Sequence, residues 1–127
     1  MNTNAINKII KRGSIPDYKF LKNLRDNYGA ATILCHPNVS WEEWGYDLSN
    51  QIDGYERHNS QQDYFKNDRV SLEKIKHLQA WHNSDAHCAA ALQYSYNLLD
   101  VEITTEEQLI EYIKSGKEHE YYIKDRY

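Results

Sequence analysis

The chain has 127 residues, of which 40% are hydrophobic and 27% are charged, a composition typical of one globular domain. Its formal net charge is −4 and it has no long basic run, which weighs against a general nucleic-acid-binding protein. The longest apolar run, residues 30–35, is far shorter than a membrane span, and residues 1–13 lack the apolar stretch of a signal peptide. Two cysteines, Cys35 and Cys88, make no disulfide framework, so we expect a cytoplasmic protein with reduced thiols and no membrane association.

The first half of the chain predicts two helices and a strand. Residues 4–12 are expected to form a short helix, and apolar residues at helical spacing after Asp17 predict a second helix, which Gly29 ends. Residues 30–35 are apolar without alternation, as in a buried strand, and Pro37 stops regular structure after them.

The middle of the chain predicts a loop, a strand and a helix. A capping box of Ser40 and Glu43 predicts a short helix within residues 39–50. Residues 52–56 are expected to form a second strand, followed by a polar loop over 57–68. A helix is expected over residues 69–77, with Val70 and Ile75 among its buried positions.

The last third predicts a strand, two helices and a final strand. Residues 78–83 are expected to be a strand, and residues 84–96 to turn into a helix. Thr104 or Thr105 caps the last helix, which has acidic residues in its first turn and ends at Gly116. Residues 118–123 are expected to form a closing strand.

Alternation of helices and strands predicts an α/β protein with a mainly parallel sheet. The carboxyl ends of parallel strands meet at one edge, where such folds build their sites. This edge would gather His36 from the first strand, residues 56–58 from the second and residues 82–87 from the third.

Asp85 and His87 are two positions apart, so in an extended backbone both side chains would point to one face and could address one metal or two adjacent metals. His36 would supply a third ligand from a neighbouring strand end. This mixture of imidazole and carboxylate suits a divalent zinc, manganese or iron ion, which can polarise a phosphoryl oxygen and lower the pKa of bound water.

The remaining histidines are expected to lie in different environments. His77 is expected on a helix face with a structural role, and His119 in solvent within a charged tail. His82 could pack beside Trp81 or face the metal site, and both readings stay open. His58 follows Glu56 by two positions, so the two side chains could share a face and support the site.

Nucleophilic catalysis is a weaker hypothesis. Cys35 adjoins His36, and Cys88 adjoins His87, but neighbouring residues of a strand face opposite ways. Neither pair is therefore expected to form a Cys/His dyad.

Four motifs together resemble PHP-domain (polymerase and histidinol phosphatase) proteins. They are "DYKFLKNLRDNYGAATILCHP", "IDGYERHNS", "NSDAH" and "TTEEQLIEYIKSGK", which occur in the family's order over roughly residues 17–117. The resemblance implies a distorted barrel of βα units holding a cluster of metals that hydrolyses phosphoesters. It implies that His36, Asp85 and His87 are metal ligands and that Glu56 is either a ligand or a supporting residue.

The chain departs from the family in lacking its first half. Family members open with an H-x-H strand, whereas the first histidine here is His36 and no H-x-H occurs. We therefore expect a partial, half barrel of mainly parallel strands in a single domain over residues 1–127. An open half barrel leaves a sheet edge that a second copy or a partner protein would have to close.

Three hypotheses follow. The chain is a hydrolytic subunit, acting on a phosphorylated substrate, whose site is completed by self-association or a partner. Alternatively, it is a degenerate PHP half with a binding, regulatory or inhibitory role. In the third, it is a compact metal-binding domain with a reduced site.

Overall fold

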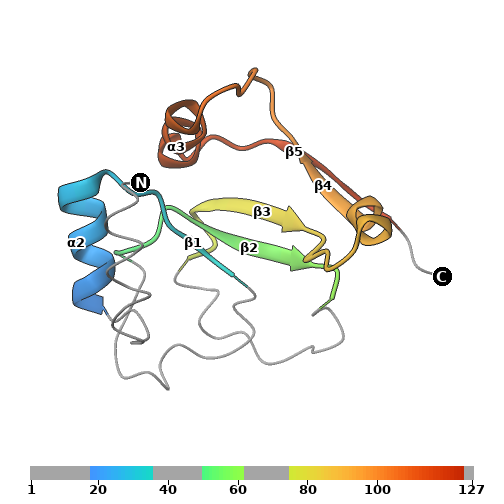
Figure 1. The fold of residues 1–127 in the computed structure, drawn as a ribbon, viewed down its shortest axis with the longest axis horizontal. Coiled ribbons are helices and arrows are strands. Elements are labelled where there is room, and N and C mark those ends of the chain that lie inside the picture. Colours follow the sequence, from blue (N-terminus) through green and yellow to red (C-terminus); the bar gives the residue numbers. More distant parts are fainter. Residues whose placement is uncertain (1–17, 36–49, 62–74, 125–127) are drawn as a thin grey trace.

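The computed structural model describes residues 18–35, 50–61 and 75–124. In chain order its elements are α2 (Tyr18–Tyr28), β1 (Ile33–Leu34), β2 (Gly54–Asn59), β3 (Gln79–Asn83), the 3-10 helix η3 (Ala89–Tyr94), β4 (Ser95–Leu98), α3 (Glu106–Ser115) and β5 (Glu120–Ile123) (Figure 1). The helix predicted for residues 4–12, the capped helix at Ser40 and most of the helix predicted for 69–77, including Val70, lie outside the described residues.

A three-stranded parallel sheet in the order β1-β2-β3 forms the centre of the fold. Ile33 pairs with Gly54, and Gly54 pairs with Gln79 in turn. The predicted α/β class and the parallel pairing of these strands are therefore confirmed. Within the described ranges the sheet does not close into a barrel.

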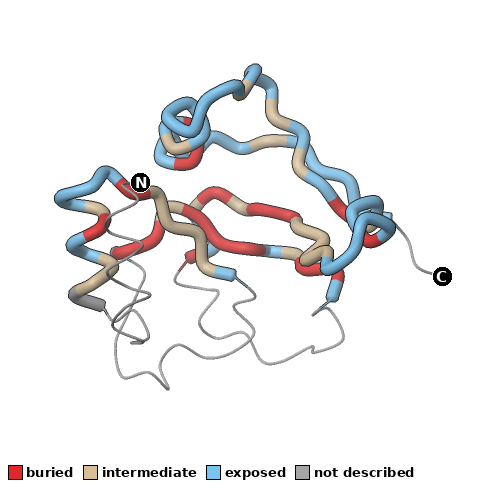
Figure 2. The backbone as a smooth tube through the Cα atoms, viewed as in Figure 1, coloured by how far each residue is buried: buried red, intermediate tan, exposed pale blue. Residues whose placement is uncertain are grey.

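Each face of this sheet carries its own apolar cluster. On one face Ile52, Tyr55 and Ile75 are buried and Leu21 of α2 packs against them. On the other, Trp81 packs against Tyr112 and Ile113 of α3. The burial is concentrated on β2 and β3, as the red segments of Figure 2 show. The helices α2 and α3 therefore pack against opposite faces of the sheet.

The sequence predicts the first residue of α3 and the last residues of both α2 and α3 correctly. Thr105 caps α3, because its hydroxyl accepts from the Gln108 backbone N–H while the Gln108 side chain accepts from the Thr105 backbone N–H. Gly29 follows α2 with φ 64° and Gly116 follows α3 with φ 67°, left-handed backbone that glycine adopts without a steric cost. None of the helices in the described ranges combines the length and apolar character needed to span a membrane.

Two predicted boundaries are wrong. β2 continues to Asn59 instead of ending at residue 56, because a bulge between Glu56 and His58 lets pairing with β3 continue through polar residues. Residues 75–77 form a turn instead of the end of a helix, although Ile75 is fully buried as expected. His77 is accordingly exposed in a turn.

The helix predicted over residues 84–96 is also wrong in type and extent. Only the 3-10 helix η3 forms there, and the chain then enters β4, which pairs antiparallel with β5. In β4 the buried Ser95 and part-buried Asn97 alternate with the exposed Tyr96 and Leu98, and this period of two is that of a strand. The closing strand is confirmed as β5, but in a second, antiparallel sheet.

Gly54 occupies a position where the sheet has no room for a side chain. A Cβ built on it would lie 2.8 Å from the Gln79 carbonyl oxygen and 3.1 Å from Trp81 Nε1. We expect Gly54→Ala to lower the free energy of unfolding by about 1–3 kcal/mol, since backbone in a packed sheet must shift to accept the methyl group. Urea denaturation measures this change. An unchanged or higher stability would contradict the close approach, because removal of glycine freedom alone stabilises a chain.

Candidate functional site

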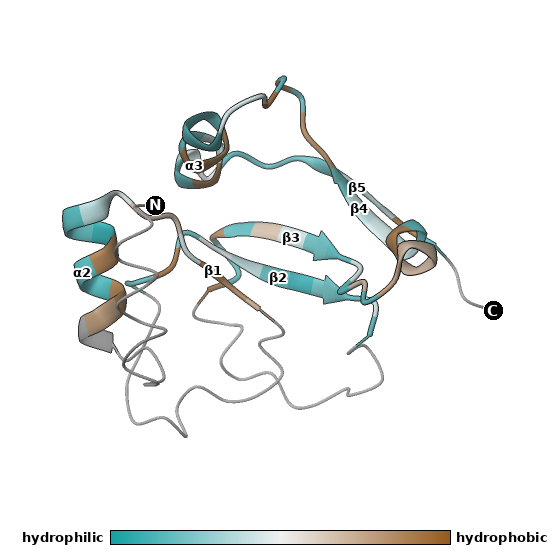
Figure 3. Cartoon of the chain, viewed as in Figure 1, coloured by the Kyte–Doolittle hydropathy of each residue, from teal (hydrophilic) through white to brown (hydrophobic). Residues whose placement is uncertain are grey.

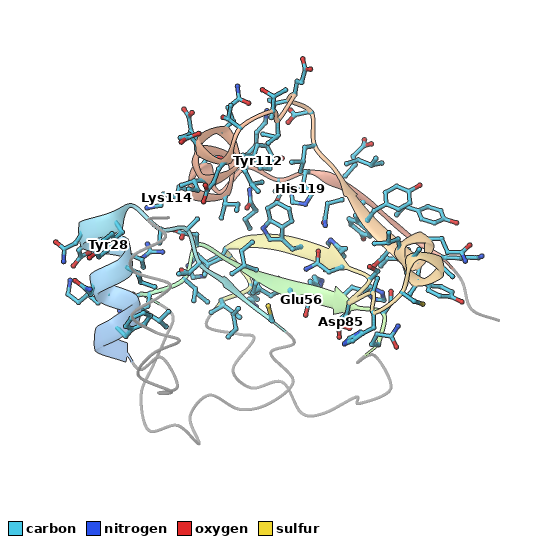
Figure 4. All side chains as sticks on the ribbon, viewed as in Figure 1. Tyr28, Glu56, Asp85, Tyr112, Lys114 and His119 are labelled. Carbon is cyan, nitrogen blue, oxygen red and sulfur yellow. The ribbon has the colours of Figure 1, made fainter. Side chains whose placement is uncertain are left out.

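The carboxyl ends of β1, β2 and β3 bring several polar side chains to one rim of the sheet. Cys35 follows β1, Glu56 lies in β2, and Asp85 follows β3 (Figure 4). Partial desolvation and the nearby negative charges of Glu56 and Asp85 raise the pKa of the Cys35 thiol. The parallel register of β1, β2 and β3 puts their carboxyl ends at one edge of the sheet, as predicted, while His36, the residue after Cys35, lies outside the described residues.

Glu56 is a buried carboxylate held in a fixed orientation. Its side chain belongs to a residue only 5% exposed, and each oxygen accepts an amide hydrogen bond. Asn59 Nδ2 donates to Oε2 at 3.0 Å, and Asn83 Nδ2 donates to Oε1 at 2.9 Å. These bonds compensate the loss of water around the carboxylate. They also suit a supporting residue, one of the two roles that the sequence left open.

The amide of Asn97 in β4 connects this rim to the second sheet. Its Nδ2 donates to Asn83 Oδ1 at 3.0 Å and to the His82 carbonyl at 3.1 Å. Its Oδ1 accepts from the His82 backbone N–H at 2.9 Å and contacts His119 Nε2 at 3.0 Å. The Asn97 side chain thus bonds to both backbone groups of His82 in β3, as a neighbouring strand would. Asn83, which Asn97 also contacts, donates in turn to Glu56.

The buried strand β2 contains several hydrophilic residues. Comparison of Figures 2 and 3 shows that β2 is mostly buried and yet mostly hydrophilic. Sequence reasoning missed the asparagines of this network, which are Asn59, Asn83 and Asn97. A signal was present, since β2 and β3 both end in the tripeptide His-Asn-Ser, at residues 58–60 and 82–84, and these ends pair in register.

Asp85 and His87 are not arranged as the spacing predicted. Asp85 has φ 52°, so the backbone between the two residues is not extended and the expectation of a shared strand face is wrong. A left-handed aspartate is uncommon and turns the chain sharply after β3. This turn brings His87 Nδ1 to 2.7 Å from the carbonyl oxygen of Asp85.

That contact fixes the protonation pattern of the exposed His87 ring. A carbonyl oxygen can only accept, so the neutral imidazole must carry its hydrogen on Nδ1 and leave the lone pair on Nε2. Metal-binding histidines commonly have this arrangement, with one nitrogen bonded to a backbone carbonyl and the other free for the ion. His87 and the Asp85 carboxylate are thus chemically suited to zinc, manganese or iron.

His58 and His82 lie away from Glu56. The bulge puts Glu56 opposite Trp81 but His58 opposite His82, and adjacent residues of β3 point to opposite faces. The shared face expected for Glu56 and His58 is therefore wrong, and His58 Nε2 lies 3.0 Å from Ser60 Oγ instead.

His82 is packed between the two sheets. It is 6% exposed and stacks on Tyr121 of β5, with ring centroids 3.5 Å apart and an interplanar angle of 9°. Its Nδ1 is buried and has no hydrogen-bond partner among the described residues. Desolvation, followed by the positive charges of His58, His119 and Arg57, lowers the pKa of His82 to about 4.

His119 is half-buried and its Nδ1 is inaccessible to solvent, so the expectation that it lies in solvent is wrong. Its ring lies 4.6 Å from that of Trp81 and 5.8 Å from that of Tyr112, and it contacts Asn97. Burial lowers its pKa. The charged residues around it in the sequence gave no sign that α3 and β5 would enclose it.

The described part of the chain holds no group of three or more His, Cys, Asp and Glu side chains placed to bind a metal ion. A complete metal centre would therefore need ligands beyond Asp85 and His87. No family model, curated protein or solved structure matches the chain.

Proposed function

We propose that the chain is a PHP-like protein related to metal-dependent phosphoesterases, with a divalent cation bound at the rim where β1, β2 and β3 end. The observation that carries the proposal is the parallel pairing of β1, β2 and β3, whose carboxyl ends share one edge of the sheet, and the predicted ligand His36 follows the first of these strands in the sequence. A bound cation there would polarise a phosphoryl oxygen and acidify a water molecule. The protein would contribute ligands from Asp85 and His87 and orientation from the buried Glu56.

We propose further that the sheet is one half of a distorted barrel. Among the described residues β1 has a strand neighbour on one side only. A second copy or a partner protein that supplies strands there would cover the edge and add ligands. Hydrolysis of phosphoesters would then require the assembled form.

A second candidate function is binding or regulation without catalysis. Two features favour it, namely that both oxygens of Glu56 already accept amide hydrogen bonds and that the described residues hold no cluster of three ligands. A degenerate half of this kind would keep the sheet as a scaffold. The two functions differ in whether the purified chain retains metal and turns over substrate.

Metal binding is tested by elemental analysis and by calorimetric titration with manganese or zinc. We expect His87→Ala and Asp85→Asn each to weaken binding at least about tenfold, as loss of a ligand or its support does. Asparagine is chosen at position 85 because it tolerates the left-handed backbone while removing the charge. Glu111→Gln, an exposed change on α3, is the matched control.

Assays of a generic phosphomonoester and a generic phosphodiester, with manganese or zinc added, separate the two candidate functions. Turnover that His87→Ala abolishes would support the hydrolase. A metal-free chain without turnover, unaffected by Asp85→Asn, would exclude the hydrolase and leave the binding function.

A further inference from the structure

The second sheet presents an unpaired strand edge at β5. This strand pairs with β4 on one side, and all four of its residues are exposed. Figure 2 shows this segment as a pale blue, exposed ribbon. A two-stranded sheet is only marginally stable, and an open edge is a template for another strand.

The hydrogen-bond pattern shows which residues face that open edge. The Lys124 N–H donates to the Tyr94 carbonyl at 2.8 Å, so these two residues form a hydrogen-bonded pair of the antiparallel ladder. Such pairs alternate along a ladder, so Glu120 and Tyr122 also turn their backbone groups toward β4. Tyr121 and Ile123 therefore direct theirs outward. In the described part of the chain, no other backbone group bonds to them.

We propose that this edge binds a second copy of the chain, with the two β5 strands antiparallel about a twofold axis through Tyr122. In this register Tyr121 of each copy lies opposite Ile123 of the other. Both residues have outward backbone groups, so each pair exchanges two hydrogen bonds and no outward group of the strand is left unpaired. The result is a continuous four-stranded antiparallel sheet with an isologous interface.

Charge complementarity selects the second copy as the occupant. The same register puts Glu120 of one copy directly opposite Lys124 of the other, twice across the axis. Lys124 is held at the strand, where its Nζ donates to Gln93 Oε1 at 2.9 Å. Opposite charges at such positions stabilise strand pairing, and like charges oppose it. An axis through Tyr121 would instead set Glu120 against Tyr122 and would put Lys124 opposite Glu118, which lies outside β5.

The aromatic side chains are also self-complementary. Tyr122 stacks on Tyr96 of β4, with ring centroids 5.0 Å apart, and both residues are exposed. In the proposed pairing the two Tyr122 side chains are direct neighbours across the axis. A single row of four tyrosines would then cover the joined sheet, and aromatic cross-strand neighbours favour pairing.

A charge-swap series tests the register in the full chain by sedimentation equilibrium. Glu120→Lys and Lys124→Glu alone each put like charges opposite one another twice, and we expect the dimer Kd to rise about tenfold. The double variant restores the opposite charges and should return the Kd to within about threefold of the original chain. Glu111→Lys on α3 makes the same charge change away from β5 and should leave the Kd unchanged. A monomeric original chain, or a double variant as weak as the single variants, would overturn the proposal.

A disulfide test reports the axis directly. Residues opposite each other in a non-hydrogen-bonded pair have Cα atoms about 4.5 Å apart, within the range of about 4.4–6.8 Å that a disulfide spans. Cys35 and Cys88 are exposed and are first replaced by serine. In that background Tyr122→Cys should give a covalent dimer on mild oxidation, whereas Tyr96→Cys on the neighbouring strand should not. Equal cross-linking of both variants would contradict the axis. Glu120, Tyr122 and Lys124 do not belong to the rim, and the charge-swap series leaves Cys35 and Cys88 in place, so the outcome of that series is independent of the proposed metal site.

Discussion

Replacement of Gln79 by leucine is expected to lower the free energy of unfolding by about 3 kcal/mol, because it removes three hydrogen bonds and leaves the buried Trp81 Nε1 without its acceptor. Gln79 is 2% exposed. Its Nε2 donates to the Tyr112 carbonyl at 3.2 Å and to the Lys117 carbonyl at 2.7 Å. Its Oε1 accepts from Trp81 Nε1 at 2.8 Å. Leucine has a similar volume, so loss of hydrogen bonding would dominate over loss of packing.

The effect should concentrate at the end of α3. The carbonyls that Gln79 binds lie in the last turn of α3 and just beyond it, where helix carbonyls need partners from outside the helix ladder, and Ser115 Oγ also donates to that of Tyr112 at 2.6 Å. Urea denaturation followed by Trp81 fluorescence would measure the loss. Gln93→Leu is the control, since Gln93 is exposed on η3 and its replacement should change stability by no more than about 0.5 kcal/mol. Equal effects of the two substitutions would refute an anchoring role for Gln79.

The second large effect is a loss of stability on acidification, caused by His82. Its pKa is about 4 in the folded chain and near 6.5 in the unfolded chain, so the unfolded state takes up a proton first as the pH falls. The contribution of neutral His82 is fully present above pH 6.5 and is lost progressively between pH 6.5 and about 4. Between pH 7 and 5 this amounts to about 2 kcal/mol. The lowered pKa of His119 acts in the same direction.

Denaturation at a series of pH values in the original chain and in His82→Phe checks this expectation. Phenylalanine keeps a ring to stack on Tyr121 and has no proton to gain. It also removes the buried Nδ1 that lacks a partner. The variant should lose most of the dependence of stability on pH between 7 and 5. If both proteins lost stability in parallel over this range, His82 would not be the responsible group.

Local sequence signals predicted the helices well because they act within a few residues. Helical spacing and terminal glycines located α2 and α3, and the Thr105 capping box was correct. An apolar run located β1 for the same reason. The helix predicted through Tyr96 is wrong because residues 95–98 form β4 instead. The alternating pattern of β4 is only four residues long, and the strand forms by pairing with the distant β5.

The candidate site was predictable in its location and not in its details. Parallel strands place their carboxyl ends together, so the grouping of Glu56 and Asp85 followed from the order of elements. The orientation of each side chain did not follow. A bulge separated Glu56 from His58, and a left-handed Asp85 redirected His87. Both are single-residue changes of backbone that periodicity cannot detect.

The sequence by itself determined the α/β class, the parallel pairing of β1 to β3 and the edge of the sheet where these strands end, since these depend on hydrophobic pattern and chain order. Only the tertiary structure decided that His82 is buried, that His119 packs beside Trp81 and that Asn97 joins the second sheet to the Glu56 network. It also decided that β5 keeps an open edge. These features depend on which polar groups meet when distant segments pack, and a buried polar residue has the same local sequence pattern as an exposed one until its partner is in place.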